Sequence, residues 1–124
     1  MISGMNHFTI VAEDPQPTTD YYIGLLGLED GYRPDLGFPG AWLYAGGNAV
    51  LHIIYGRPMP AVRTGVLDHM AFSATGLQET KARFDASGLQ YALGQQAGTG
   101  IWQLFSFDPN GARVELDFDP AETL

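Results

Sequence analysis

The chain has 124 residues, of which 45% are hydrophobic, and this predicts a single domain over residues 1–124 with a core of its own. It contains no cysteine, which excludes disulfides, thiolate metal sites and thiol nucleophiles. The formal net charge of −8 makes nucleic acids and anionic membranes unexpected partners. No stretch approaches the roughly 20 apolar residues of a membrane span, and no signal-peptide pattern opens the chain, so we expect a cytoplasmic protein.

The first half of the chain reads as a strand, a helix and three further strands. Residues 5–11 are rich in β-branched and aromatic side chains, which is typical of a strand. Asp14 is a good N-cap, so a helix is expected from there to about Leu26, ended by Gly27. Three strand-like runs follow at 28–33, 41–44 and 49–55, with a glycine turn at 46–48.

The same order of elements then begins again. Residues 56–65 are rich in proline and glycine and are expected to form a linker. After it, a strand is expected at 66–73 and a helix at 77–86. Further strands are expected at 89–93, 100–107 and 112–118, with the Asp-Pro-Asn-Gly turn of residues 108–111 before the last.

Two pairs of segments show that this order is an internal repeat. NHFTIVA at 6–12 matches DHMAFSA at 68–74, and AVLHIIY at 49–55 matches ARVELDF at 112–118. The two pairs are separated by almost the same number of residues. The expected fold class is therefore α+β, with one βαβββ unit at about 5–55 and a second at about 66–118.

The only three histidines of the chain occupy matched positions in this repeat. His7 and His69 fall at the same place in the two first strands, and His52 matches Glu115 in the two last strands. Three imidazoles and a carboxylate would converge if the two curved sheets enclosed a shared concavity. Two imidazoles and one carboxylate with open positions are typical of Fe(II) sites, and Zn²⁺, Mn²⁺, Ni²⁺ or Co²⁺ also bind such a set. The pattern predicts a divalent-metal site.

This pattern resembles the vicinal oxygen chelate superfamily, which includes glyoxalases, bleomycin-resistance proteins and extradiol dioxygenases. The resemblance spans nearly the whole chain and is carried by His7 in MNHFTI, His69 in LDHMAF, FDPNG at 107–111 and Glu115 in VELDF. It implies a glyoxalase/dioxygenase-like fold with mixed sheets around a metal-binding concavity. It also implies that His7, His69 and Glu115 bind a divalent metal that acts as a Lewis acid on two adjacent substrate oxygens.

The fourth matched position separates the branches of the superfamily. Glyoxalase-like members usually carry a carboxylate there, where this chain has His52. Extradiol dioxygenases use an acid/base histidine near this place, although they have a tyrosine where this chain has Phe105. Fosfomycin-resistance members need cationic groups, and the six cations of this chain form no obvious cluster in the sequence. Bleomycin-binding members lack the metal ligands.

The resemblance leaves three functions open. An Fe(II)-dependent, ring-cleaving oxygenase with His52 as acid/base or fourth ligand is slightly favoured. A glyoxalase- or epimerase-like lyase or isomerase is the alternative, and a non-catalytic protein that binds a toxic compound is the third. Each takes a small-molecule ligand, and single-domain members commonly form homodimers. Four strand aromatics are expected either in the core or along an apolar substrate pocket: Trp42, Tyr44, Trp102 and Phe105.

Overall fold

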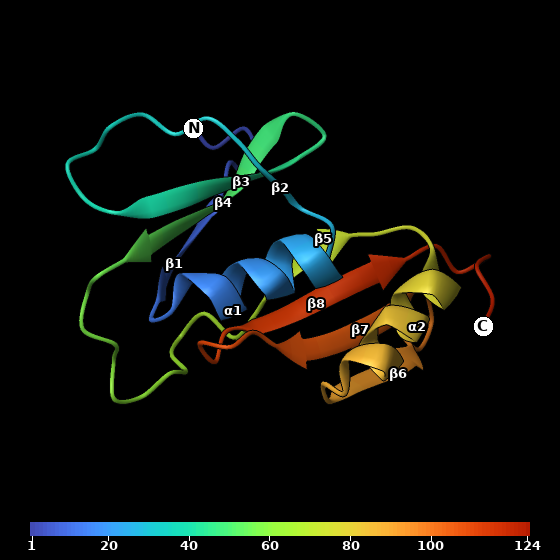
Figure 1. Ribbon diagram of the computed structural model, residues 1–124. Helices are drawn as coiled ribbons and strands as arrows, with labels where there is room; N and C mark the ends of the chain where they lie inside the picture. Colours follow the sequence, from blue (N-terminus) through green and yellow to red (C-terminus); the bar gives the residue numbers. More distant parts are fainter. The chain divides into compact units, whose positions relative to one another are not determined.

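The computed structural model describes all 124 residues, which form two compact units, Met1–Arg63 (unit 1) and Thr64–Leu124 (unit 2). Each unit contains one helical segment and a four-stranded mixed sheet (Figure 1). The predicted α+β fold with two βαβββ units is confirmed.

Unit 1 has the strand order β1-β4-β3-β2, in which β1 pairs with β4 in parallel and the other pairs are antiparallel. A glycine pair with positive φ, Gly46 at 56° and Gly47 at 83°, makes the tight turn between β3 and β4. The elements are β1 (Phe8–Ala12), α1 (Pro15–Thr19), η1 (Asp20–Leu25), β2 (Glu29–Asp30), β3 (Gly40–Ala45) and β4 (Asn48–Tyr55).

Unit 2 repeats this arrangement with the order β5-β8-β7-β6, and β5 is parallel to β8. In the predicted turn before β8, the Asp108 carboxylate accepts hydrogen bonds from the amides of Asn110 and Ala112, each 2.8 Å long. These bonds fix the point at which β8 begins. The elements are β5 (Met70–Ser73), α2 (Leu77–Ser87), β6 (Tyr91–Gln95), β7 (Trp102–Phe107) and β8 (Arg113–Phe118).

The first helix differs from the prediction of one α-helix over residues 14–26. Asp14 caps its start as expected, but the α-helical part ends at Thr19 and a π-helix continues to Leu25. Thr18 and Thr19 donate side-chain hydrogen bonds to carbonyls four residues earlier, an arrangement that often bends helices. The segment closes with a bond from the Leu28 amide to the Tyr22 carbonyl, around the predicted stop at Gly27.

Several strands are shorter or shifted relative to the prediction. The strand predicted at 28–33 is reduced to Glu29–Asp30, because the chain turns away into the loop that leads to β3. The strand predicted at 66–73 begins only at Met70. Consequently His7 and His69 lie one residue before β1 and β5, not inside strands as predicted.

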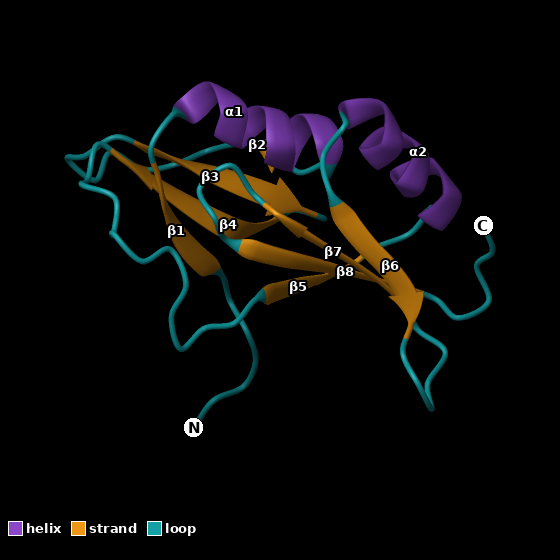
Figure 2. Cartoon of the chain, turned by 90° about the horizontal axis from the view of Figure 1, so that it is seen from below, coloured by secondary structure: helices purple, strands orange, loops and turns teal.

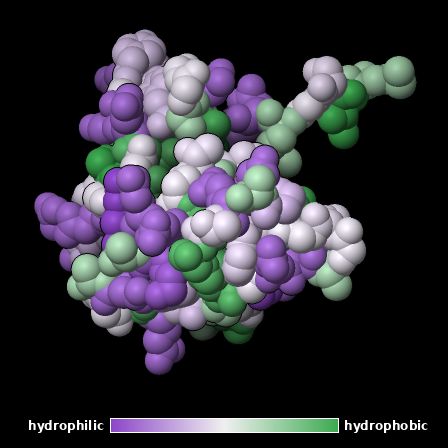
Figure 3. Space-filling model, turned by 90° about the vertical axis from the view of Figure 1, so that its right-hand side faces the viewer, coloured by the Kyte–Doolittle hydropathy of each residue, from purple (hydrophilic) through white to green (hydrophobic).

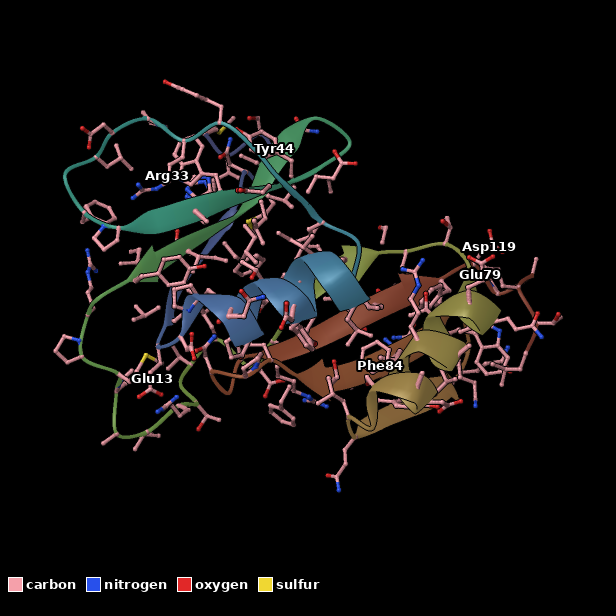
Figure 4. The ribbon with its side chains drawn as sticks, viewed as in Figure 1. Glu13, Arg33, Tyr44, Glu79, Phe84 and Asp119 are labelled. Atoms are coloured by element: carbon pink, nitrogen blue, oxygen red, sulfur yellow. The ribbon has the colours of Figure 1, made fainter.

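Each sheet has one face turned to the core and one that carries polar and aromatic groups, because successive side chains of a strand alternate. In unit 2 the core side holds Leu104, Val114 and Leu116, all buried. Helix α2 lies along the sheet of β6 and β7 (Figure 2), and its buried Phe84 contacts the Tyr91 ring with centroids 5.4 Å apart (Figure 4). In unit 1 the core side holds Leu43, Leu51 and Ile53.

The surface mixes polar and apolar side chains, as Figure 3 shows for the face it presents. No helix is both long enough and apolar enough to cross a bilayer. The large exposed hydrophobic residues are scattered through termini, loops and strand ends, which is ordinary for a folded protein.

Candidate metal and substrate site

Two of the predicted metal ligands meet directly in unit 2. The Nε2 atom of His69 lies 2.7 Å from Oε2 of Glu115. His69 immediately precedes β5, and Glu115 lies on β8 opposite Ala71, so the parallel pairing of these strands brings the two side chains together. The side chain of His69 remains 36% exposed, whereas that of Glu115 is 5% exposed.

Both groups are held in place by neighbouring polar side chains. The Nδ1 atom of His69 bonds to Oδ2 of Asp68 over 2.7 Å, and Arg113 donates to the same oxygen over 3.0 Å. Because a carboxylate only accepts, Nδ1 carries the proton in the Asp68 bond, and Nε2 is the nitrogen that is left to bind a metal when it carries no proton. Gln103 on β7 donates to the second oxygen of Glu115 over 2.5 Å.

Burial gives the Glu115 carboxyl an unusual environment. Desolvation is the main reason that the pKa of Glu115 lies above its ordinary value, and a hydrogen bond with Asp117 raises the pKa further. His69 and Gln103 act in the opposite direction. A desolvated carboxylate next to an imidazole gains strongly from a nearby cation.

Unit 1 brings the other two histidines together in a stack of three rings. His7 and His52 lie with ring centroids 3.6 Å apart and planes at 12°, and Trp42 covers the other face of His52 at 4.1 Å and 10°. The strand register explains the stack, because His52 pairs with Thr9 of β1 and with Trp42 of β3. His7 bonds through Nδ1 to the Asn6 side chain over 2.7 Å, so its Nε2 also offers a lone pair.

The surroundings of His52 favour its neutral form. Burial is the largest cause that lowers the pKa of His52, followed by the neighbouring His7, while a hydrogen bond to the Ala49 backbone raises the pKa and Arg33 lowers it. A neutral imidazole can accept a proton near neutral pH.

The registers of the two sheets reveal which residues are equivalent in the repeat. Trp42 pairs with His52 in unit 1, and Phe105 pairs with Glu115 in unit 2. Trp42 therefore corresponds to Phe105 in the repeat. The Phe105 ring contacts His69 edge-on, with centroids 6.0 Å apart, and carries the Arg113 guanidinium 4.5 Å from its centre.

The other two aromatic candidates lie elsewhere. Trp102 pairs with Phe118 and stands on the core side of its sheet, opposite to Glu115; its Nε1 donates to the Glu122 carbonyl over 2.9 Å. Tyr44 shares the face of Trp42, but its hydroxyl donates to the Tyr32 carbonyl over 2.5 Å and so holds the loop before β3.

The residues present fit a divalent metal. Two ligands bound at roughly 2.1 Å to one ion, at about a right angle, lie roughly 3 Å apart, and the His69–Glu115 separation of 2.7 Å is close to this. Imidazole nitrogens oriented by a neighbouring oxygen acceptor are the usual form of metal-binding histidine. Neither unit by itself brings together three or more side chains of the metal-binding kind, so the pair in unit 2 is an incomplete ligand set.

Sequence reasoning missed the residues that orient these ligands. Asn6 and Asp68 each directly precede a histidine and bond to its Nδ1, so their matched place in the repeat was a usable signal. Gln103 had no such signal, because only the β7–β8 register places it beside Glu115.

Comparison with known proteins agrees with the fold. No family model matches the chain. In sequence the chain is 24% identical over 122 residues to "Glyoxylase I 4" of Arabidopsis thaliana, covering 93% of this chain and 70% of that protein.

Two solved structures illustrate the likeness in three dimensions. A glyoxalase family protein from Enterococcus faecalis is 27% identical with a TM-score of 0.67, over 93% of this chain and 97% of that one. The fosfomycin resistance protein FosX from Listeria monocytogenes, solved with Mn(II) and a dihydroxypropylphosphonic acid, has 19% identity and a TM-score of 0.75, over 96% and 94%. The repeated βαβββ fold and these likenesses are consistent with the resemblance of the chain to the vicinal oxygen chelate superfamily.

Proposed function

We propose that the protein is a divalent-metal-dependent lyase or isomerase of the glyoxalase-like kind, acting on a small, oxygen-rich organic molecule. The observation that carries the proposal is the oriented His69–Glu115 pair, whose Nε2 and Oε2 atoms lie 2.7 Å apart. His7 is proposed as the third ligand, because its Nε2 is oriented by Asn6 as that of His69 is by Asp68.

The chain's own residues have distinct roles in this proposal. The bound metal supplies Lewis acidity for two adjacent oxygens of the substrate. His52, whose pKa is lowered mainly by burial, accepts a proton from the carbon next to a substrate carbonyl and returns it to a neighbouring atom. Trp42 and Phe105 provide apolar surface beside the reacting groups.

Ring-cleaving oxygenation is the second candidate, favoured by the neutral His52 imidazole. It takes second place because Phe105, equivalent to Trp42, offers no hydroxyl at that point of the site, and because the relatives named above are glyoxalase-family and fosfomycin-resistance proteins. Because the relatives named above give no reason to prefer Fe²⁺, we propose Mn²⁺, Ni²⁺, Co²⁺ and Zn²⁺ as equal candidates for the metal. This agrees with the Mn(II) in the FosX structure.

An anaerobic assay separates the two candidates. Chelator-treated protein is reloaded with each metal in turn and offered thiol adducts of 2-oxoaldehydes, 2-oxo and 2-hydroxy acids, and catechols. The proposal expects turnover without oxygen by the Mn²⁺, Ni²⁺, Co²⁺ or Zn²⁺ form. Oxygen uptake with a catechol by the Fe²⁺ form alone, and no anaerobic turnover, would establish the oxygenase instead.

A further inference from the structure

Two arginines of unit 1 converge on one aromatic ring. The guanidinium carbon of Arg33 lies 4.9 Å from the centre of the Phe38 ring, and that of Arg57 lies 5.7 Å from it. No carboxylate pairs with either of them in the structure, whereas Arg63, Lys81 and Arg113 each form an ion pair. The sequence showed no obvious cluster of cations. The fold corrects this, because it brings Arg33 and Arg57, which are 24 positions apart in the sequence, to the same ring.

The loop before β3 and the end of β4 hold these arginines in position. Arg33 donates through Nη2 to the Phe38 carbonyl over 3.0 Å. The Tyr55 amide donates to the Pro39 carbonyl over 3.0 Å, and this bond ties the chain just before Arg57 to the same loop. Asp35, which lies in the same loop, accepts a hydrogen bond from the Gly37 amide.

Gly40 shows on which face of the sheet Arg33 lies. A Cβ atom at Gly40 would meet the Ile53 carbonyl oxygen and would come within 2.9 Å of the Arg33 Nη2 atom, so the guanidinium borders the space that a side chain would fill there. Gly40 and Trp42 are two residues apart on β3, and their side-chain directions are the same. Arg33 therefore lies on the face that carries Trp42 and His52, about 7 Å along the strand. Figure 4 shows Arg33 beside β3.

The Arg33 guanidinium has donors left for a ligand. It donates one hydrogen bond, to the Phe38 carbonyl, and its Nε is buried without a partner. The planar fork of a guanidinium matches the geometry of carboxylate and phosphate oxygens.

We propose that Arg33 and Arg57 form an oxyanion subsite, which holds a carboxylate, phosphate or phosphonate of the substrate beside His52. The inference rests on the proposed function, since it names the charged group of the molecule that the metal site transforms. The spacing of about 7 Å between the Arg33 and His52 rows fits a small molecule whose anionic group is separated by a few bonds from the carbon that reacts.

Anion binding by the metal-free protein tests this subsite directly. Inorganic phosphate and acetate are titrated into chelator-treated, ¹⁵N-labelled protein at constant ionic strength set with chloride. We expect saturable shifts of the backbone amides of Phe38, Gly40 and Arg57. Arg57→Gln and Arg33→Gln should each weaken binding by about tenfold or more. Arg83→Gln, which removes an exposed charge on α2, is the matched control and should leave binding unchanged.

The possible results are decisive in either direction. Arg57 donates no hydrogen bond to the protein, so Arg57→Gln remains informative if Arg33→Gln fails to fold. Binding as tight in Arg57→Gln as in the wild type, or no saturable shift with either anion, would overturn the subsite. The titration uses metal-free protein and so tests the subsite independently of the metal site. If the protein binds phosphate but binds no metal, the subsite is supported and the proposed function is contradicted. The anion that binds more tightly, phosphate or acetate, identifies the substrate's charged group.

Discussion

The Nε2 atom of His69 and the Oε2 atom of Glu115 lie 2.7 Å apart in unit 2, and two lone pairs at that distance require a proton or a cation between them. We expect near-stoichiometric divalent metal in protein purified without chelator and without nickel affinity. His69→Ala and Glu115→Gln should each lose most of it, because each removes one oriented ligand. Elemental analysis of the three proteins measures the effect.

Glu79→Gln provides a charge-matched control for Glu115→Gln. Glu79 lies in the first turn of α2 and is not one of the proposed ligands, and its substitution should leave the metal content unchanged. An absence of metal from the wild type, even after reconstitution with each candidate ion, would contradict the metal site.

The orienting residues provide a second and graded prediction. Asp68→Ala removes the acceptor of the His69 Nδ1 proton, and Asn6→Ala does the same for His7. Each should weaken metal binding about 10–100-fold without abolishing it. Competition with a fluorescent chelator measures the affinity, and Asp85→Ala, which breaks an exposed ion pair with Lys81, should leave it unaltered. Equal affinities in all four proteins would show that orientation contributes nothing.

The sequence predicted the fold because the repeat and its turns are local signals. The Gly46-Gly47 turn and the Asp108 turn could be read directly, and both are present in the structure. The position of the helix after Asp14 was predicted correctly, but its π-helical second half was not. The threonine side-chain hydrogen bonds that accompany the π-helix leave no mark on the pattern of hydrophobic residues from which helices are predicted.

The candidate site was only partly open to prediction. The matched positions of His69 and Glu115 predicted that they would meet, as they do. The stack of His7, His52 and Trp42 depends on strand register, because a shift of one residue in register would turn strand side chains to the other face of the sheet. The Arg33–Phe38–Arg57 contact depends on the path of an irregular loop, for which the sequence has no period.

His52 provides a third prediction, on catalysis. His52→Ala removes the proposed proton acceptor while it leaves His69 and Glu115 intact. The rate constant kcat should fall about 10²–10⁴-fold with the metal content unchanged. Added imidazole should restore part of the activity, which a purely structural role would not allow. Loss of metal from His52→Ala would instead identify His52 as a ligand.

A buried hydroxyl outside the site gives a prediction on stability. The Tyr55 hydroxyl is buried without a hydrogen-bond partner, so Tyr55→Phe should raise the free energy of unfolding by roughly 1 kcal/mol. Tyr91→Phe is the matched control: its hydroxyl donates to Asp85 over 2.5 Å, so that substitution should be neutral or slightly destabilising. Urea unfolding at pH 7 compares the three proteins.

The same tyrosine gives the stability a pH dependence at high pH. Burial raises the pKa of Tyr55 above 10.0, and Asp30 raises the pKa further. The folded state therefore keeps the phenolic proton where the unfolded state releases it, so that stability falls as pH rises above about 10. Tyr55→Phe should lack this part of the loss, and its advantage over the wild type should grow between pH 9 and pH 11. A constant difference across that range would contradict the raised pKa.

The distribution of ligands between the two units leads to the last prediction, a homodimer. Unit 1 supplies His7 and His52, unit 2 supplies His69 and Glu115, and neither unit holds three metal-binding side chains in one group. A complete set therefore needs a unit 1 and a unit 2, from one chain or from two. We propose that two chains associate, which light scattering at micromolar concentration tests; a monomer would contradict it.

Mixing His7→Ala protein with Glu115→Ala protein then locates the sites. If sites are shared between chains, the mixed dimer regains one intact set of His7, His69 and Glu115 and binds metal again. If each site is built within one chain, both proteins stay defective and mixing restores nothing.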